Sequence, residues 1–197
     1  MEAGDASGTG VFDPALKEWD HGLVDKLGYR KYFPEEISDP NAAIGTLKPE
    51  VSRHFGLPDD VVVGPGSGDN MMAALGAGAV EAGKFVASLG TSGTIFASHN
   101  TTIDSELISN FCDSLGDNLP LVCTQNCATV PEEIRKAFKL SVEEITTLAQ
   151  AEDVGCEGLV IIPYLSGERT PNEPLSCGVM YGLRPEMMQR PGLLYRA

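Results

Sequence analysis

The stretch from Val61 to Phe96 constrains the fold more than any other part of this 197-residue sequence. It opens on three consecutive valines, a short apolar run that predicts a buried β-strand. A turn rich in glycine, proline and serine follows. After it, small apolar residues from Met71 to Val80 recur at helical spacing. The sequence therefore predicts a strand, a tight turn and a helix in direct succession.

Asp69 and Asn70 stand between this turn and the helix, so a carboxylate is presented at a helix start. Two interpretations are open. An aspartate here is commonly an N-cap, which stabilises a helix by about 1 kcal/mol. Alternatively, it faces a ligand. Gly76 and Gly78 favour the second interpretation, because glycine within a helix costs about 1 kcal/mol relative to alanine and suggests a close neighbour, either a backbone or a ligand.

A hairpin is predicted at the end of the stretch, with strands Phe85–Leu89 and Thr94–Ser98. Its tip consists of Gly90, Thr91, Ser92 and Gly93. Such a turn offers backbone N–H groups and hydroxyls to an anion, as phosphate-binding turns do. The same four residues also form ordinary hairpins, so the pattern alone leaves both interpretations open.

Composition excludes several classes of partner. The net charge of −14 argues against nucleic acid or an anionic membrane as a partner. It does not argue against ATP, because backbone amides and Mg²⁺ can hold the phosphates of ATP. The five cysteines form no CxxC pair and are odd in number, which favours reduced thiols in a cytosolic protein over disulfides or a zinc site. The sequence has no run of eighteen apolar residues and no basic leader, and it predicts a soluble, cytoplasmic protein.

Two further segments give local predictions. A helix is expected over Pro14–Leu27, with Asp13 as its N-cap and Gly28 past its end. Trp19 could stack on a sugar, but its place in the apolar stripe of that helix favours the core. Farther along, the apolar run Gly158–Leu165 predicts a buried strand.

The charged loop Gly167-Glu168-Arg169-Thr170-Pro171 follows that strand. An ion-paired surface turn is one interpretation of this loop, and a functional role is the other.

The motif Gly68-Asp69-Asn70 followed by a small-residue helix, and then Ser88-Leu89-Gly90-Thr91-Ser92-Gly93, resembles the FGGY carbohydrate kinases, most closely those that act on xylulose. The resemblance implies an α/β, actin-like (ribonuclease H-like) fold of two domains, incomplete at both ends of this chain. Residues 1–83 would be the C-terminal part of the first, sugar-binding domain. Residues 84–197 would be the N-terminal part of the second, ATP-binding domain.

The same resemblance implies phosphorylation of D-xylulose to D-xylulose 5-phosphate by ATP with Mg²⁺. Asp69 would be the base that accepts the proton of the sugar hydroxyl, and Asn70 would bind the sugar. The hairpin residues Gly90, Thr91, Ser92 and Gly93 would face the ATP phosphates. No residue of this chain is assigned to the metal, the expected partners are the sugar and ATP, and a homodimer is left open.

Two alternatives remain at this stage. The sugar could be ribulose, gluconate or glycerol, or the chain could be a non-catalytic remnant of such a kinase. The family's early phosphate strand and its later adenine loop have no counterpart in the sequence. We therefore expect a central fragment that lacks appreciable kinase activity by itself.

Overall fold

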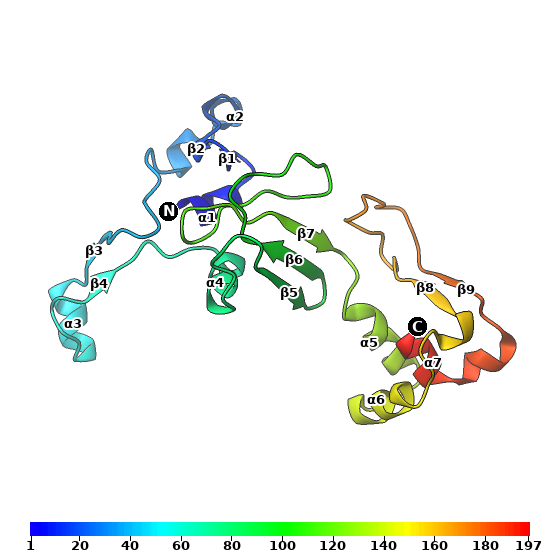
Figure 1. Cartoon of the computed structure of the whole chain (residues 1–197). Coiled ribbons are helices and arrows are strands. Elements are labelled where there is room, and N and C mark those ends of the chain that lie inside the picture. Colours follow the sequence, from blue (N-terminus) through cyan, green and yellow to red (C-terminus); the bar gives the residue numbers. More distant parts are fainter. The chain divides into compact units, whose positions relative to one another are not determined.

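The computed structural model describes residues 1–197, which divide into two compact units (Figure 1). The first unit comprises Met1–Val86 and Ile95–Leu121, and the second comprises Ala87–Thr94 and Val122–Ala197. Each unit is described by itself. The predicted domain limit after Gly83 is a different division of the chain and stays a prediction. No helix has the length and apolar character needed to cross a bilayer.

Short elements make up the first unit before the central hairpin. In chain order they are α1 (Ala3–Ser7), β1 (Phe12–Asp13), β2 (Glu18–Trp19), α2 (His21–Lys26), the 3₁₀ turn η1 (Arg30–Tyr32), β3 (Gly45–Thr46), α3 (Pro49–Phe55), β4 (Val62–Val63) and α4 (Asp69–Gly76). Their core contains Ala6, Val11, Phe12, Trp19 and Val24, which are all buried. This cluster packs α1 against the β1–β2 hairpin and α2.

The predicted helix over Pro14–Leu27 is wrong in its first half. Asp13 does cap the following residues, because its carboxylate accepts the amides of Ala15 at 2.8 Å and Leu16 at 3.0 Å. The chain then turns back through Lys17, whose φ is +57°, and pairs β1 with β2. The helix begins only at His21.

Trp19 lies in β2 instead of a helix, yet it is 7% exposed, so its assignment to the core is confirmed. Its indole packs edge-on against Phe12 at 5.4 Å between ring centroids and against Phe33 at 4.6 Å.

The valine strand of the central stretch forms, but it is not buried as predicted. It is β4, which pairs with β3 in a two-stranded antiparallel sheet. Val62 is 65% exposed. A two-stranded ribbon leaves its outer face uncovered, and the alternate side chains of β4 point to that face.

Helix α4 begins at Asp69 as predicted and ends at Gly76, four residues before the end of the predicted run. Gly78 stops it by adopting a left-handed φ of +82° just past the helix end, where glycine is strongly preferred. A Cβ built on Gly76 or Gly78 meets no atom within 4 Å. The expectation of a close backbone neighbour at these glycines is therefore wrong, because one of them is a helix terminator and the other faces open space. A ligand beside them stays a prediction.

The predicted hairpin is confirmed as β5 (Phe85–Leu89) and β6 (Gly93–Ala97). A third strand, β7 (Leu121–Thr124), joins β6, giving the sheet order β5-β6-β7 (Figure 1). Phe96 of β6 is 1% exposed, and Leu119 just before β7 is fully buried. The strand is thus held by apolar packing on one side, while Gly90 and Thr91 at the hairpin tip are exposed.

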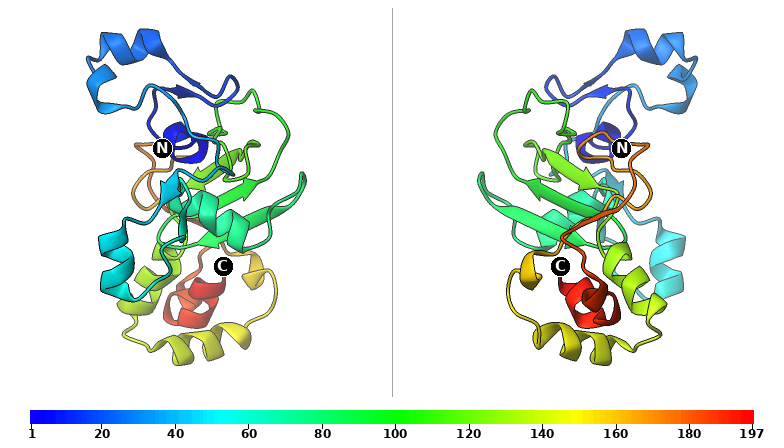
Figure 2. Two further views of the ribbon diagram at one scale, coloured as in Figure 1. Left: turned by 90° about the vertical axis from the view of Figure 1, so that its left-hand side faces the viewer. Right: turned by 90° about the vertical axis from the view of Figure 1, so that its right-hand side faces the viewer.

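Helices dominate the second unit beyond β7. The elements are α5 (Thr129–Ala137), α6 (Val142–Gln150), the 3₁₀ turn η2 (Cys156–Gly158), β8 (Val160–Ile162), β9 (Val179–Tyr181), the 3₁₀ turn η3 (Pro185–Gln189) and α7 (Pro191–Arg196). Helix α7 lies against α5 and α6 (Figure 2). Its Gly192 approaches α6 so closely that a Cβ there would lie 2.5 Å from the carbonyl carbon of Leu148.

The apolar run Gly158–Leu165 forms a strand, β8, but its predicted burial is wrong. β8 pairs only with β9, in a two-stranded antiparallel sheet, and Val160 is 53% exposed.

All five cysteines are free thiols. Burial raises the pKa of the Cys112 thiol to about 11, so this cysteine is a packing residue of the first unit.

Candidate active site

Asp69 is the first residue of α4 and is exposed. The N-cap is Gly68, an extended residue with φ −63° and ψ 153° that makes no side-chain cap. The interpretation of Asp69 as an N-cap is therefore wrong. One carboxylate oxygen accepts the amide of Asn70 at 2.8 Å, and the other has no hydrogen-bond partner within the chain. The positive end of the helix dipole favours a charged carboxylate in this first turn.

Asn70 lies next to Asp69 and is also exposed. Its side-chain amide makes no hydrogen bond within the chain. The two neighbours thus offer a carboxylate and an amide to solvent from one helix start. Asp69 and Asn70 are the two predicted site residues in the first unit, and both lie in the first turn of α4.

The hairpin tip lies in the second unit and is fixed by the segment after β7. The carbonyl of Gly90 accepts the Ala128 amide at 3.0 Å, and the carbonyl of Thr91 accepts the Cys127 amide at 3.2 Å. The Thr129 hydroxyl donates to the same Thr91 carbonyl at 3.0 Å. The tip is therefore attached by the carbonyls of Gly90 and Thr91 to the start of α5.

Two of the four tip amides are already used within the fold. The Gly90 amide donates to the Ser92 carbonyl at 3.1 Å, and the Gly93 amide donates to the Thr124 hydroxyl at 3.2 Å. The amides of Thr91 and Ser92 donate to no group in the chain, and neither do their hydroxyls. These four donors are available for an anionic ligand.

A pocket of about 490 Å³ opens beside Thr91. The first turn of α5 lines it together with Lys136 and Tyr195. The charges on α5 are paired, with Arg135 at 2.6 Å from Glu132 and Lys136 at 3.0 Å from Glu133. The hydrogen bond from Arg135 holds the pKa of Glu132 below its usual value, so this wall carries no unpaired acid at the helix start. The pocket volume lies in the range of small-molecule sites.

Glu168 was missed as a site residue, and the interpretation of its loop as an ion-paired surface turn is wrong. The side chain is 4% exposed and makes no ion pair. Its carboxylate accepts backbone amides from Gln125, Asn126 and Arg169, the last at 2.7 Å. The Asn126 side chain adds a further bond at 3.2 Å. Glu168 thus ties its loop to the segment that connects β7 with α5.

Burial by itself raises the pKa of Glu168, but the hydrogen bonds from Gln125, Arg169 and Asn126 outweigh it and hold the pKa below the ordinary value. Arg169 next to it has no carboxylate partner. Its guanidinium instead donates to the Cys123 thiol at 3.0 Å and to the Gln125 side-chain carbonyl at 3.2 Å. The loop is therefore organised around a buried carboxylate.

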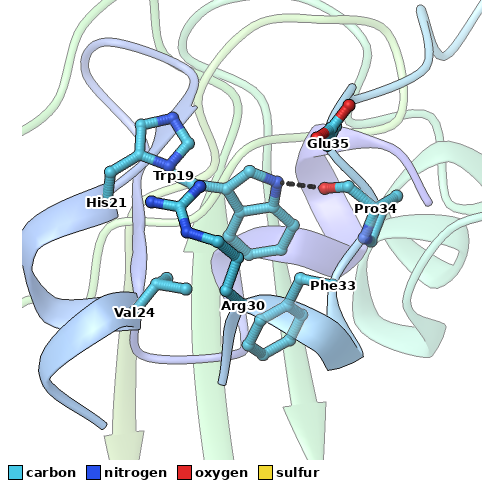
Figure 3. Close-up of a pocket in the computed structure, with 7 residues that line it drawn as sticks. All are labelled: Trp19, His21, Val24, Arg30, Phe33, Pro34 and Glu35. Carbon is cyan, nitrogen blue, oxygen red and sulfur yellow. Dashed lines mark hydrogen bonds between the residues drawn. The ribbon is translucent and has the colours of Figure 1, made fainter. Parts of the chain in front are cut away.

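A smaller cavity of about 260 Å³ adjoins Trp19 in the first unit (Figure 3). The indole N–H donates to the Pro34 carbonyl at 2.9 Å, and Phe33 lies against the ring. Because Trp19 is 7% exposed, it presents little ring surface on which a sugar could stack.

Comparison with known proteins places this geometry in a family. Residues 1–76 match the N-terminal domain of the FGGY family of carbohydrate kinases. The xylulose kinase of Haemophilus influenzae is 36% identical over 198 aligned positions, which cover 98% of this chain and 40% of that relative. The chain is similar to the FGGY carbohydrate kinases over nearly its whole length. The chain spans about two fifths of the length of this relative.

Solved structures of FGGY kinases share its fold. The crystal structure of xylulose kinase from Bifidobacterium adolescentis matches with a TM-score of 0.81 and 31% identity, over the whole of this chain and 41% of that chain. The gluconate kinase of Lactobacillus acidophilus matches with a TM-score of 0.84 at 24% identity and the same coverage, a likeness of fold alone. The predicted α/β sugar-kinase fold is confirmed, and the fold by itself does not distinguish the sugars.

Proposed function

We propose that this chain contributes the catalytic base and a phosphate-binding hairpin to an ATP-dependent kinase that converts D-xylulose to D-xylulose 5-phosphate. The observation that carries the proposal is the 36% identity to a xylulose kinase over 98% of the chain. The exposed, unpaired carboxylate of Asp69 supplies the chemistry that the reaction needs.

Asp69 accepts the proton of the sugar hydroxyl as that oxygen attacks the γ-phosphate. Its free carboxylate oxygen supports this role, because a general base must reach the proton directly. Asn70 hydrogen-bonds a neighbouring sugar hydroxyl and orients the sugar.

The hairpin tip binds the ATP phosphates through the amides and hydroxyls of Thr91 and Ser92. Gly90 and Gly93 shape the turn, since their own amides are engaged within the fold. The pocket beside Thr91 accommodates the nucleotide beyond its phosphates, with Tyr195 as an aromatic wall. Phosphoryl transfer depends mainly on positioning and charge neutralisation, so a pre-formed amide turn contributes directly to catalysis.

Mg²⁺ bound with the nucleotide would neutralise its phosphates. The chain holds no group of three or more His, Cys, Asp or Glu side chains placed to bind a metal ion. The donors of Thr91 and Ser92 fit phosphate oxygens. We also propose a domain limit near Gly83, which the family match over residues 1–76 supports. The cytoplasmic location and the homodimer stay predictions.

A panel of sugars tests the substrate. The gene product that contains this chain, at its full natural length, is assayed for ATP consumption with D-xylulose, ribulose, gluconate and glycerol. We expect the largest kcat/KM with D-xylulose. A larger kcat/KM with another member of the panel would reassign the sugar, and ATP consumption with none of the four would favour a non-catalytic remnant.

A further inference from the structure

A buried carboxylate lies at the start of α1, in the same unit as the proposed base. Glu2 is fully buried and accepts three hydrogen bonds. The amides of Gly4 and Asp5 donate to it at 2.6 Å and 2.7 Å, which makes Glu2 the N-cap of α1. The third donor is the hydroxyl of Ser67, at 2.7 Å. A capping carboxylate needs only the first two bonds, so the third calls for a separate explanation.

Ser67 belongs to the glycine-rich turn that leads into α4 and stands two residues before Asp69. Its bond to Glu2 is the one hydrogen bond that residues 64–67 make in the fold. Side chains built on Gly64 and Gly66 would meet no atom within 4 Å, and Gly66 has a φ of +72°. Packing therefore holds this turn weakly, and its position depends on the Ser67 hydroxyl.

The fold accommodates this contact closely. A Cβ on Gly4 would lie 2.6 Å from the Ser67 hydroxyl oxygen and 2.9 Å from a Glu2 carboxylate oxygen, so only glycine leaves room for the bond. Helix α1 itself is fixed, because Ala3 and Ala6 are buried in the core of the first unit. Glu2 is thus a buried acceptor on a packed helix, and the glycine-rich turn is attached to it through Ser67.

We propose that Glu2 and Ser67 are positioning residues that set where Asp69 meets the sugar hydroxyl. This inference rests on the proposed role of Asp69. A hydrogen bond to an ionised acceptor is about twice as strong as one between neutral groups, and a displacement of about 1 Å at a reacting group can cost a hundredfold in rate. Neither residue takes part in proton transfer.

Ser67→Ala tests the proposal in the gene product at its full natural length. The substitution leaves Glu2 with both of its amide donors, so α1 stays capped. We expect kcat for D-xylulose to fall about tenfold to a hundredfold. The KM for ATP should change by less than about twofold, because the nucleotide is bound elsewhere.

Ser7→Ala is the matched control. The Ser7 hydroxyl also bonds within the α1 region, donating to the Gly4 carbonyl at 2.8 Å and accepting the Cys112 amide at 3.1 Å, but it does not touch the glycine-rich turn. The loss of a hydroxyl bond should lower the melting temperature in both variants. We expect kcat to fall in Ser67→Ala and to stay unchanged in Ser7→Ala.

A double-mutant cycle with Glu2→Gln completes the test, since a glutamine offers one acceptor oxygen in place of two. If the pair acts as a unit, Glu2→Gln combined with Ser67→Ala should lower kcat no further than the stronger single variant. If Ser67→Ala fails to fold, the kcat of Glu2→Gln by itself tests the proposal, and we expect it to fall. An unchanged kcat in the folded variants, or fully additive losses, overturns the proposal. If Asp69→Asn also retains kcat, it is the role of the base that fails.

Discussion

Gly93 of β6 and Thr124 of β7 form two hydrogen bonds with each other. The Thr124 hydroxyl accepts the Gly93 amide at 3.2 Å and lies 3.3 Å from the Gly93 carbonyl oxygen, to which it donates. A Cβ on Gly93 would lie 2.8 Å from that hydroxyl oxygen and 3.3 Å from Cys127. The residue that ends the hairpin tip is therefore fixed by a contact that only glycine permits, directly beside the start of α5.

Gly93→Ala should weaken ATP binding more than sugar binding, because the added methyl displaces Thr124 and with it the tip amides of Thr91 and Ser92. We expect a loss of at least about tenfold in nucleotide affinity, equivalent to about 1.4 kcal/mol, measured by calorimetry with Mg²⁺-ATP. Gly90→Ala is the control, since a Cβ there first meets an atom at 3.5 Å. Equal losses for ATP and sugar would mean that the substitution merely unfolds the region.

Gly192→Ala should destabilise the second unit. The methyl would lie 2.5 Å from the Leu148 backbone, so α7 must move away from α6. We expect a decrease in unfolding free energy of about 1–3 kcal/mol, measured by urea denaturation. A variant as stable as the parent would show that α6 and α7 do not pack this closely.

Gly76→Ala should have the opposite effect in α4. No atom lies within 4 Å of the added Cβ, and alanine favours a helix over glycine by about 0.5–1 kcal/mol. We expect a slightly higher melting temperature. A lower one would restore the idea of a close neighbour at this glycine, which the sequence suggested.

Glu168 should make the stability of the second unit depend on pH. Its folded-state pKa lies below the ordinary value of 4.5, so the carboxylate stabilises the fold above that pH, and the contribution is lost as the pH falls through the folded-state pKa. Glu168→Gln should lower the unfolding free energy at pH 7 by about 1.5–3 kcal/mol. The difference from the parent should shrink below pH 4.5. Glu173→Gln, an exposed change in the same loop, should show neither effect.

The sequence predicts the elements whose determinants are contiguous. The hairpin with its Gly90–Gly93 tip, and the carboxylate at the start of α4, depend on neighbouring residues and are found where expected. The helix over Pro14–Leu27 fails for a local reason too. An aspartate followed by proline opens a hairpin turn as readily as a helix, and pairing with β2 decides between them.

Residues that hold the site together are less visible in the sequence. Glu2 and Ser67 are 65 positions apart, and Glu168 accepts an amide from Gln125, 43 positions away. An isolated glutamate in a sequence carries no sign of such a partner, because the amides that surround it come from another segment. The burial of β4 and β8 is mispredicted since an apolar run does not reveal whether a strand has one neighbour or two.

The most direct test of the central claim is the kcat of Asp69→Asn in the gene product at its full natural length. Asparagine keeps the size of the side chain and removes the carboxylate, so the change removes the base. We predict that kcat with D-xylulose falls by about a hundredfold to ten-thousandfold while ATP affinity stays nearly unchanged. Asp60→Asn, which removes one exposed charge nearby in sequence, should keep the parent kcat. A kcat for Asp69→Asn close to that of the parent would contradict the account.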